Sequence, residues 1–394
     1  MERQPRLVFV VTHGVSADQL LRGKPAFMRQ RGFDVTVIAS PGKELDRVAE
    51  REGVRTIGVS MERPVRPWKD TVSLAALGTV LRSLQPDIVD ASTPKAGLLG
   101  MVAACALRVP LRIYLLRGLR LETAHGALRK VLATTERIAS RCAHEVVCNS
   151  KSLRERVVSQ GLVPESKALV LGEGSSGVDV ERWTATTERK REGQRLLGAA
   201  GIREGDEIIG FIGRFDPDKG IEDLLEAFVR VKTARPRARL LLIGGGHAGD
   251  WHPRLAQRMQ GMQGVVALPS TDELAPYYAA MHVLAFPSLR EGFPNVPLEA
   301  ACAGVPAVGY RSTGVVDAIA DGETGTIVPQ RDVAALADAV LRYLCDPTLR
   351  DAHGKAARLR AENQFSRSIV LERWASHYRG RLAEVSRGRW GASR

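Results

Sequence analysis

The sequence has few cysteines, few aromatic residues and no long hydrophobic run. Its five cysteines are an odd number, form no CxxC pair and stand among apolar neighbours, a pattern typical of buried, reduced thiols. The most apolar stretch, residues 96–107, has 12 residues and is too short to cross a bilayer. The apolar run at residues 7–11 is too short for the core of a signal peptide and is typical of a buried strand. These absences favour a cytoplasmic protein without a membrane span.

Patterns that hold metals or cofactors are also scarce. The eight histidines are scattered and form no HExxH motif. The segment GGGHAG, residues 244–249, satisfies GxGxxG, but the proline after it delays the helix that a dinucleotide site needs, which disfavours NAD or FAD. Asp216 and Asp218 spell DxD at a point where aspartates commonly cap a helix or form a turn. We therefore expect neither a metal ion nor a cofactor.

The formal net charge of +13 is compatible with three partners: nucleic acid, an anionic membrane surface or an anionic substrate. Aromatic residues make up only 5% of the chain and no stacking motif accompanies the arginines, which argues against nucleic acid. The positive charge is concentrated in residues 108–160, which contain eleven Lys and Arg but only four Glu. Two interpretations of this segment remain open: it binds an anionic partner, or it is a charged surface exposed to solvent without a partner.

Within this basic segment, the spacing predicts a helix with two faces. The basic outer face comprises Lys130, Arg137 and Arg141. The opposite face, which we expect to pack on the core, comprises Leu128, Val131, Leu132 and Ile138.

Short apolar runs alternate with segments long enough for one helix each, a rhythm typical of βα units on a parallel sheet. The expected strands lie in residues 6–14, 33–42, 86–93, 111–118 and 144–150, and then in residues 207–214, 239–246, 264–270, 282–288, 307–310 and 325–329. We therefore predict an α/β protein with two Rossmann-like parallel-sheet domains that face each other across a cleft. The expected domains are residues 1–180 and 181–365, and a helical tail, residues 366–394, packs across both.

Two carboxylates, Glu291 and Glu299, lie eight residues apart in a segment rich in glycine, proline and small apolar residues. We expect Glu291 in a loop after a buried strand and Glu299 in the first turns of a short helix, with Pro297 in its first turn and Gly304 at its end. The alternative is structural: Glu299 would stabilise the helix start and Glu291 would be a surface loop residue.

The start of this helix is a natural seat for an anion, because its free N–H groups and the helix dipole favour negative charge. Those N–H groups belong to Asn295, Val296 and Leu298. Arg214 and Lys219 in GRFDPDKG follow another expected strand, where two cations could neutralise a departing diphosphate. Cations, N–H donors and carboxylates together suit a ligand with both phosphate and hydroxyl groups, such as a nucleotide sugar.

Glu291-x7-Glu299 within EGFPNVPLEA, together with GRFDPDKG, resembles the donor domain of retaining family 4 glycosyltransferases of the GT-B fold. By this resemblance, Arg214 and Lys219 would bind the donor diphosphate and stabilise its departure. Glu291 would bind the hydroxyls of the donor sugar, and Glu299 would bind the ribose. Backbone contacts to the donor would come from Gly14, Asn295, Val296 and Leu298.

Motifs in the first half, among them STPKAGLLG and LLRGLRLE, resemble a bacterial subgroup that adds sugars to polyprenyl-diphosphate-linked saccharides. The resemblance implies an acceptor diphosphate near Lys95, Arg117 and Arg120, and a cytoplasmic protein bound peripherally to the anionic inner face of the cell membrane. The chain departs from the family pattern at two places. His13-Gly14 stands where paired glycines are usual, and Asp90-Ala91-Ser92 stands where an HxH-like run is common.

These features predict transfer of a sugar from a nucleoside diphosphate sugar, expected to be UDP-linked, to a hydroxyl of a lipid-linked saccharide. The resemblance implies that the anomeric configuration is retained. Three alternatives remain open: a sugar-nucleotide epimerase of the same fold, a transferase that acts on a soluble small-molecule acceptor, and a nucleic-acid-binding protein.

Overall fold

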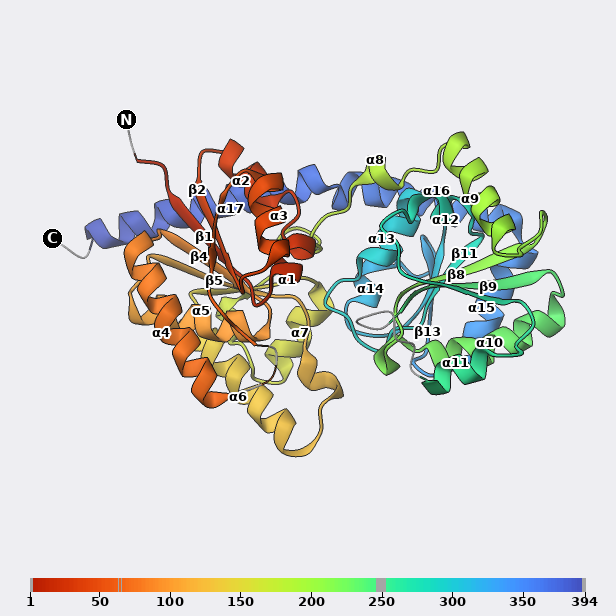
Figure 1. Ribbon diagram of the computed structural model, residues 1–394, viewed down its shortest axis with the longest axis horizontal. Coiled ribbons are helices and arrows are strands. Elements are labelled where there is room, and N and C mark those ends of the chain that lie inside the picture. Colours follow the sequence, from red (N-terminus) through yellow and green to blue (C-terminus); the bar gives the residue numbers. More distant parts are fainter. Residues whose placement is uncertain (1–2, 63, 65, 246–252, 392–394) are drawn as a thin grey trace. The chain divides into compact units, whose positions relative to one another are not determined.

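The computed structural model describes residues 3–62, 64, 66–245 and 253–391 (Figure 1). The chain forms two compact units: unit 1 comprises residues 1–174 and 370–394, and unit 2 comprises residues 175–369. The domain limits expected from the sequence remain predictions, and most of the GGGHAG segment lies outside the described residues. Within the described part of the chain, no helix has both the length and the apolar character that crossing a membrane requires.

Unit 1 is built on a parallel sheet with the strand order β3-β2-β1-β4-β5-β6-β7. Its strands are β1 (Arg6–Val10), β2 (Asp34–Ala39), β3 (Arg55–Gly58), β4 (Ile88–Ser92), β5 (Leu111–Leu116), β6 (Glu145–Cys148) and β7 (Ala168–Leu169). Its helices are α1 (Gly14–Leu20), α2 (Lys24–Gln30), α3 (Lys43–Glu52), α4 (Pro67–Leu84), α5 (Pro94–Ala106), α6 (Gly126–Cys142) and α7 (Lys151–Ser159), with short 3₁₀ turns η1 (Arg120–Thr123) and η2 (Glu165–Lys167). The five strands predicted for this half are confirmed, and β3 and β7 were not predicted.

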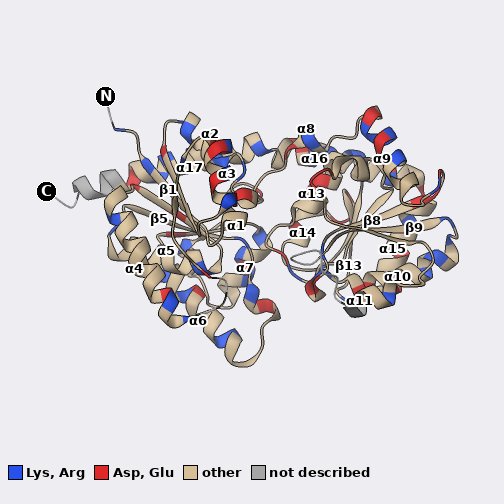
Figure 2. Ribbon diagram, viewed as in Figure 1, with Lys and Arg blue, Asp and Glu red and all other residues tan. Residues whose placement is uncertain are grey.

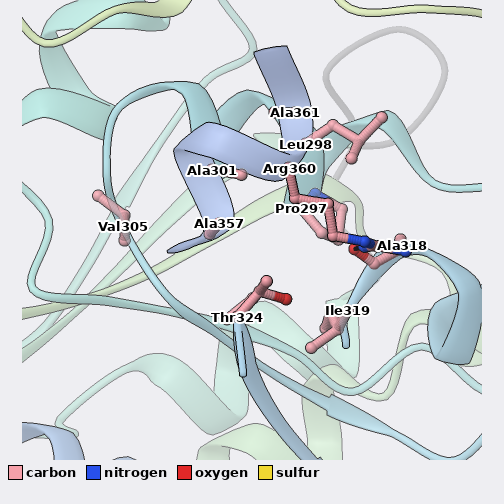
Figure 3. A pocket seen from close by; sticks show the side chains of 11 residues that line it. Pro297, Leu298, Ala301, Val305, Ala318, Ile319, Thr324, Ala357, Arg360 and Ala361 are labelled. Carbon is pink, nitrogen blue, oxygen red and sulfur yellow. Dashed lines mark hydrogen bonds between the residues drawn. The ribbon is translucent and has the colours of Figure 1, made fainter. Parts of the chain in front are cut away.

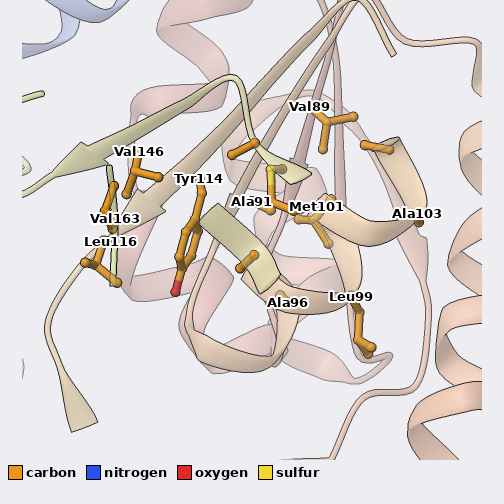
Figure 4. Packing of buried hydrophobic residues seen from close by; sticks show 14 of the residues in the cluster. Val89, Ala91, Ala96, Leu99, Met101, Ala103, Tyr114, Leu116, Val146 and Val163 are labelled. Carbon is orange, nitrogen blue, oxygen red and sulfur yellow. The ribbon is translucent and has the colours of Figure 1, made fainter. Parts of the chain in front are cut away.

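The core of unit 1 depends on a close approach of α5 to the sheet. A Cβ atom at Gly97 would lie 2.2 Å from the ring of Tyr114 on β5, and one at Gly100 would lie 2.9 Å from the Cβ atom of Ala91 on β4. Glycine is therefore the residue that lets α5 pack directly on these two strands. Figure 4 shows Tyr114 and Ala91 among the buried side chains of this cluster. This packing fixes the start of α5, where Lys95 is the second helical residue.

Helix α17 (Arg367–Gly391) contributes Trp374 and Tyr378 to the second core cluster of unit 1. The Tyr378 hydroxyl donates to the buried Asp90 carboxylate, and Lys24 Nζ lies 3.0 Å from the same Oδ2 atom. Lys24 Nζ also lies 3.4 Å from the centre of the Trp374 ring. Burial lowers the pKa of Lys24 to about 8, against the attraction of Asp90. The strand position that departs from the HxH pattern thus holds a carboxylate that anchors α17 to the sheet.

Unit 2 is built on a second parallel sheet with the strand order β10-β9-β8-β11-β12-β13. Its strands are β8 (Glu207–Arg214), β9 (Ala238–Gly245), β10 (Val265–Leu268), β11 (Val283–Phe286), β12 (Ala307–Tyr310) and β13 (Gly325–Val328). Its helices are α8 (Val180–Trp183), α9 (Thr187–Ala199), α10 (Ile221–Ala234), α11 (Pro253–Met259), α12 (Ala275–Ala280), α13 (Asn295–Cys302), α14 (Val315–Ala318), α15 (Val333–Cys345) and α16 (Pro347–Phe365), with a 3₁₀ turn η3 (Pro217–Lys219). All six strands predicted for this half are confirmed.

Two sequence predictions about burial need correction. Cys148 and Cys302 are buried, but Cys345 is exposed and Cys105 and Cys142 are partly exposed; all five are free thiols. The prediction of buried thiols is therefore wrong for three of them.

Helix α6 presents most of its predicted core-facing stripe to solvent. Of that stripe Leu132 is buried, but the exposed fractions of Leu128, Val131 and Ile138 are 47%, 45% and 39%. The buried face instead consists of Leu132, Glu136, Ala139 and Ser140. Basic and apolar side chains therefore lie together on the exposed side of α6, whose Lys and Arg segments are blue in Figure 2.

Candidate active site

The candidate site of unit 2 lies at the carboxyl ends of β8 and β11. Chain order reverses between these two neighbouring strands, because β9 and β10 lie on one side of β8 and β12 and β13 lie beyond β11. In open α/β sheets, ligands bind outside the carboxyl ends of the strands at such a switch point. The loop that starts at Arg214 and the loop that carries Glu291 both leave the sheet here.

Gly220 brings these two loops together. It adopts a left-handed conformation with φ +68°, and a Cβ atom there would lie 2.1 Å from the carbonyl oxygen of Pro287. Any other residue would combine backbone strain with a collision against main chain. The Leu289 N–H donates to the Asp218 carbonyl over 2.8 Å, which joins the loops a second time.

Lys219 and Glu291 meet directly at this junction. Lys219 Nζ lies 2.5 Å from Glu291 Oε1, and the Ser288 hydroxyl donates to the same oxygen over 2.9 Å. The Glu291 N–H donates to the Thr313 carbonyl over 2.9 Å. The side chains of Lys219 and Glu291 are only 14% and 17% exposed. Glu291 is thus a loop residue held through both its backbone and its side chain.

Arg214 lies at the end of β8 and is half exposed. Its guanidinium pairs with the Asp216 carboxylate, while Asp218 pairs with Arg290 over 2.9 Å. Of the two roles predicted for Asp216 and Asp218, a cap or a turn, the structure shows the turn: both belong to the segment around η3, Asp216 makes no side-chain cap to it, and the residue before α10 is Gly220. In the described part of the chain, no group of three or more His, Cys, Asp or Glu side chains is placed to hold a metal ion.

Helix α13 begins at Asn295, so Pro297 is its third residue and lies in the first turn, as predicted. Proline is tolerated at the third helical position because its missing N–H has no intrahelical acceptor there. Helix geometry leaves the N–H groups of Asn295 and Val296 unused within α13, whereas that of Leu298 is the first to point at a carbonyl of the helix start. Gly304, with φ +74°, follows the helix as predicted.

Gly314 packs directly against the loop before α13. A Cβ atom at Gly314 would lie 2.7 Å from the carbonyl oxygen of Gly292, and its φ is +77°. The start of α13 is therefore fixed by main-chain packing as well as by the Glu291 contacts.

A small cavity is lined by residues of α13 and α16, among them Pro297, Leu298 and Ala361 (Figure 3). Its volume of about 10 Å³ is the space of a single water molecule, too small for a nucleotide. Leu298 lines it together with Arg360 of α16, whose guanidinium donates to the carbonyls of Ala318 and Asp317 over 2.8 and 2.7 Å. The Leu298 side chain is buried in the core, so any contact of this residue with a ligand is limited to its backbone.

Glu299 lies one helical turn into α13 and does not contact Lys219 or Glu291. Its Oε2 atom accepts a hydrogen bond of 2.8 Å from the hydroxyl of Tyr278 on α12. Burial raises the pKa of Glu299, while this hydrogen bond opposes the rise. Sequence reasoning missed Tyr278, since its spacing marks only a core position. It also missed Ser288, although its place just after a strand was a usable signal.

Of the residues proposed for unit 1, two lie at its own switch point between β1 and β4, and the two arginines follow β5. Gly14 begins α1, and a Cβ atom there would lie 3.1 Å from Glu44 and Leu45 of α3, so its small size serves helix packing. Lys95 Nζ lies 2.5 Å from Asp70 Oδ1, and its side chain is 10% exposed.

The two arginines near Lys95 in the prediction differ in exposure. Arg117 donates to the Leu20 carbonyl over 3.2 Å, and burial lowers its pKa, against the attraction of Asp90. Arg120 begins η1 and is exposed. No hydrogen bond or ion pair among the described contacts joins Lys95, Arg117 and Arg120 to one another.

Comparison with known proteins gives the family. A family model described as "Glycosyl transferases group 1" matches residues 206–346, and one described as "Glycosyl transferase 4-like domain" matches residues 26–174. The capsular polysaccharide biosynthesis glycosyltransferase CapM of Staphylococcus aureus is 34% identical over 369 residues, which cover 93% of this chain and 94% of CapM.

Solved structures agree on the fold. HepE of Anabaena, in complex with UDP-glucose, superposes with a TM-score of 0.79 over 95% of this chain and 99% of its own, at 19% identity. Sucrose-phosphate synthase of Thermosynechococcus elongatus gives a TM-score of 0.79 over 97% of this chain and 100% of its own, at 20% identity. The predicted GT-B class and its two parallel-sheet domains are confirmed, and so is the prediction of a transferase. The chain belongs to the group 1 glycosyltransferases.

Proposed function

We propose that this glycosyltransferase moves a sugar from a UDP-sugar to a hydroxyl of a polyprenyl-diphosphate-linked saccharide, with retention of the anomeric configuration. The proposed donor site rests on one observation: Lys219 pairs with Glu291 over 2.5 Å at the switch point of unit 2. Two relatives support the wider assignment: HepE was solved with UDP-glucose, and CapM acts in capsular polysaccharide biosynthesis.

The donor would be held by groups of opposite chemistry. Arg214, Lys219 and the N–H groups at the start of α13 suit the diphosphate, because cations and helix N-termini both favour negative charge. Glu291 accepts hydrogen bonds from hydroxyls of the sugar, and Glu299 accepts them from the ribose. Gly14 is the proposed point of close backbone approach from unit 1.

Bond breaking places negative charge on the diphosphate. The bond between the sugar carbon and the phosphate oxygen breaks, the sugar gains oxocarbenium character, and Arg214 and Lys219 stabilise the leaving diphosphate. The acceptor hydroxyl attacks the same carbon from the face of the leaving group, and its proton passes to the departing phosphate oxygen. Glu291 positions the sugar through hydrogen bonds and forms no covalent bond to it.

The acceptor half rests on unit 1. Arg120 is exposed, while Lys95 is paired with Asp70 and Arg117 is partly buried, so we assign the first contact with the acceptor diphosphate to Arg120 and the later ones to Lys95 and Arg117. Lys130, Arg137 and Arg141 share the exposed side of α6 with apolar side chains, which suits reversible attachment to the anionic inner face of the cell membrane.

The donor is identified first by thermal unfolding of the full chain with a panel of UDP-, GDP- and ADP-sugars, since a ligand of the native state raises the melting temperature. Release of free UDP is then measured with a polyprenyl-diphosphate saccharide, with the same saccharide lacking its lipid diphosphate, and without acceptor. We expect release only with the lipid-linked acceptor. Equal use of the free saccharide would overturn the lipid-linked acceptor, and turnover of the donor into an isomer without acceptor would overturn the transferase reaction.

Membrane attachment is tested separately by sedimentation with anionic and with neutral vesicles at low and high salt. We expect retention on anionic vesicles that salt reverses. A protein that no vesicle retains would overturn this part of the proposal.

A further inference from the structure

Tyr278 is a fully buried residue with a polar group aimed at the proposed nucleotide site. Its relative exposure is 0%, and its hydroxyl donates to Glu299 Oε2 over 2.8 Å. Its ring meets the Trp183 ring edge to face, with the centres 5.6 Å apart and the planes at 84°. A buried tyrosine hydroxyl needs a hydrogen-bond partner, and here that partner is a carboxylate assigned to the ligand.

The position of Tyr278 is fixed by the packing of its helix. α12 packs against α9, where a Cβ atom at Gly193 would lie 2.2 Å from the carbonyl oxygen of Pro276. The Tyr278 N–H donates to the Leu274 carbonyl over 3.1 Å. Main-chain contact with α9 thus fixes α12, the Trp183 ring packs on the phenol, and the hydroxyl reaches Glu299 on α13.

The charged and titratable groups around Glu299 come from four elements: Arg182 on α8, Tyr278 on α12, Cys302 on α13 and Arg367 at the start of α17. Burial raises the pKa of Glu299, whereas the hydrogen bond from Tyr278 and the charges of Arg182 and Arg367 oppose this. Both arginines have other partners: Arg182 donates to the Asp272 carbonyl over 2.8 Å, and Arg367 to Asp179 over 3.2 Å. Tyr278 is thus the direct partner of the carboxylate.

We propose that Tyr278 is a positioning residue for the nucleotide: its hydroxyl fixes the Glu299 carboxylate so that the remaining acceptor sites of that carboxylate face the ribose hydroxyls. A carboxylate offers about four acceptor sites and a phenol hydroxyl takes one of them. The inference rests on the proposed contact of Glu299 with the ribose. It implies that the Tyr278–Glu299 pair sets a preference for ribonucleoside over 2′-deoxyribonucleoside diphosphates.

The test measures binding of UDP and of 2′-deoxy-UDP to the full-length protein by calorimetry. Four variants are compared with wild type: Tyr278→Phe, Glu299→Gln, the double variant, and Tyr310→Phe as a matched control. Tyr310 is also buried and donates to a carboxylate, that of Asp223 over 3.0 Å, but it belongs to the other core cluster of unit 2. Thermal unfolding of each variant reports whether loss of the hydroxyl has altered the fold.

We expect Tyr278→Phe to weaken UDP binding about tenfold, as for loss of a hydrogen bond to a charged group, and to change 2′-deoxy-UDP binding much less. In the Glu299→Gln background the same change should have no further effect on UDP, and Tyr310→Phe should bind like wild type. Loss of the Tyr278 hydrogen bond should also raise the pKa of Glu299 further, because this bond opposes the rise that burial causes. The weakening should therefore grow as the pH is lowered, since more of the carboxyl is then protonated.

Two results would overturn the inference in different ways. If Glu299→Gln weakens UDP binding and Tyr278→Phe does not, or if their effects add in the double variant, Tyr278 has no positioning role although the ribose contact stands. If Glu299→Gln leaves UDP binding unchanged, the ribose contact in the proposed function is itself wrong. Glu299→Asp gives a second route that leaves the tyrosine in place. The shorter side chain withdraws the carboxylate from the hydroxyl, so binding equal to wild type would also count against the inference.

Discussion

Replacement of Lys219 by alanine tests the charge that carries the donor assignment. The variant removes a cation 2.5 Å from Glu291 and leaves that carboxylate with the Ser288 hydroxyl as its remaining side-chain partner in the described site. Loss of one preorganised group that stabilises growing charge raises the barrier by roughly 2–4 kcal/mol, which lowers kcat about 30- to 1000-fold. Because the pair is mostly buried, we also expect the free energy of unfolding to fall by about 1–2 kcal/mol, which a folded domain tolerates.

The assay is release of nucleoside diphosphate at saturating donor and acceptor, with thermal unfolding as a parallel measurement. Lys219→Arg restores a cation and should recover part of the turnover. Arg235→Ala is the matched control, since it breaks an ion pair with Glu207 at the opposite end of β8. It should cost stability but leave kcat near that of wild type. Near-normal turnover of Lys219→Ala, or an equal loss in Arg235→Ala, would refute the reasoning.

Three further predictions concern the same site. Glu291→Gln keeps the shape of the side chain but loses the charge that pairs with Lys219, so kcat should fall severely with the fold intact. Glu299→Gln should mainly raise the KM for the donor. Steady-state kinetics separates the two variants, and small, equal effects would support purely structural roles. Arg214→Ala should also lower kcat roughly 30- to 1000-fold, because the half-exposed guanidinium is proposed to stabilise the leaving diphosphate and not the fold. An unchanged kcat would exclude Arg214 from the site. Treatment with EDTA should leave activity unchanged, since Asp216 and Asp218 pair with arginines; activity lost to EDTA and restored by Mn²⁺ would contradict this.

The strands other than β3 and β7 could be predicted because each is a short run rich in apolar residues, and such runs carry their own signal. β7 comprises only the residue pair Ala168–Leu169, and β3 (RTIG) has Ile57 as its only large apolar residue, so neither gives that signal. The site in unit 2 could be predicted because Glu291 and Glu299 stand at a fixed spacing after a strand. Ser288 could have been found from its place just after β11, but Tyr278 could not, since a hydrogen bond between α12 and α13 leaves no trace in either segment alone.

Helix α6 shows why the periodic pattern chose the wrong face. Its spacing offers two candidate faces, and the larger apolar side chains Leu128 and Ile138 suggested one of them. The observed buried face carries Glu136, whose carboxylate accepts a hydrogen bond of 2.8 Å from the Tyr114 hydroxyl on β5. Because that partner lies 22 residues away in sequence, the reason for burying a carboxyl group is tertiary and not local.

Glu136 also makes the stability of unit 1 depend on pH in a predictable direction. Burial raises its pKa from 4.5 to about 7, although the Tyr114 hydrogen bond opposes the rise. The folded state therefore prefers the protonated carboxyl, and this contribution to stability is lost as pH rises through about 7. A shift of this size corresponds to about 3 kcal/mol at high pH. Glu136→Gln should accordingly raise the melting temperature relative to wild type at about pH 8 and lose this advantage at about pH 5.

Glu145 provides a control of opposite sign in the same unit. Burial alone would raise its pKa, but the hydrogen bonds and charges of His377 and Arg381 outweigh burial, and the pKa falls below its usual value. Its contribution to stability is present at neutral pH and is lost in acid, as pH falls through the lowered pKa. Glu145→Gln should therefore lower the melting temperature at about pH 8 and have a smaller effect in acid. If both variants change stability with pH in the same direction, the buried Tyr114–Glu136 pair does not control the titration, and the burial of Glu136 has another cause.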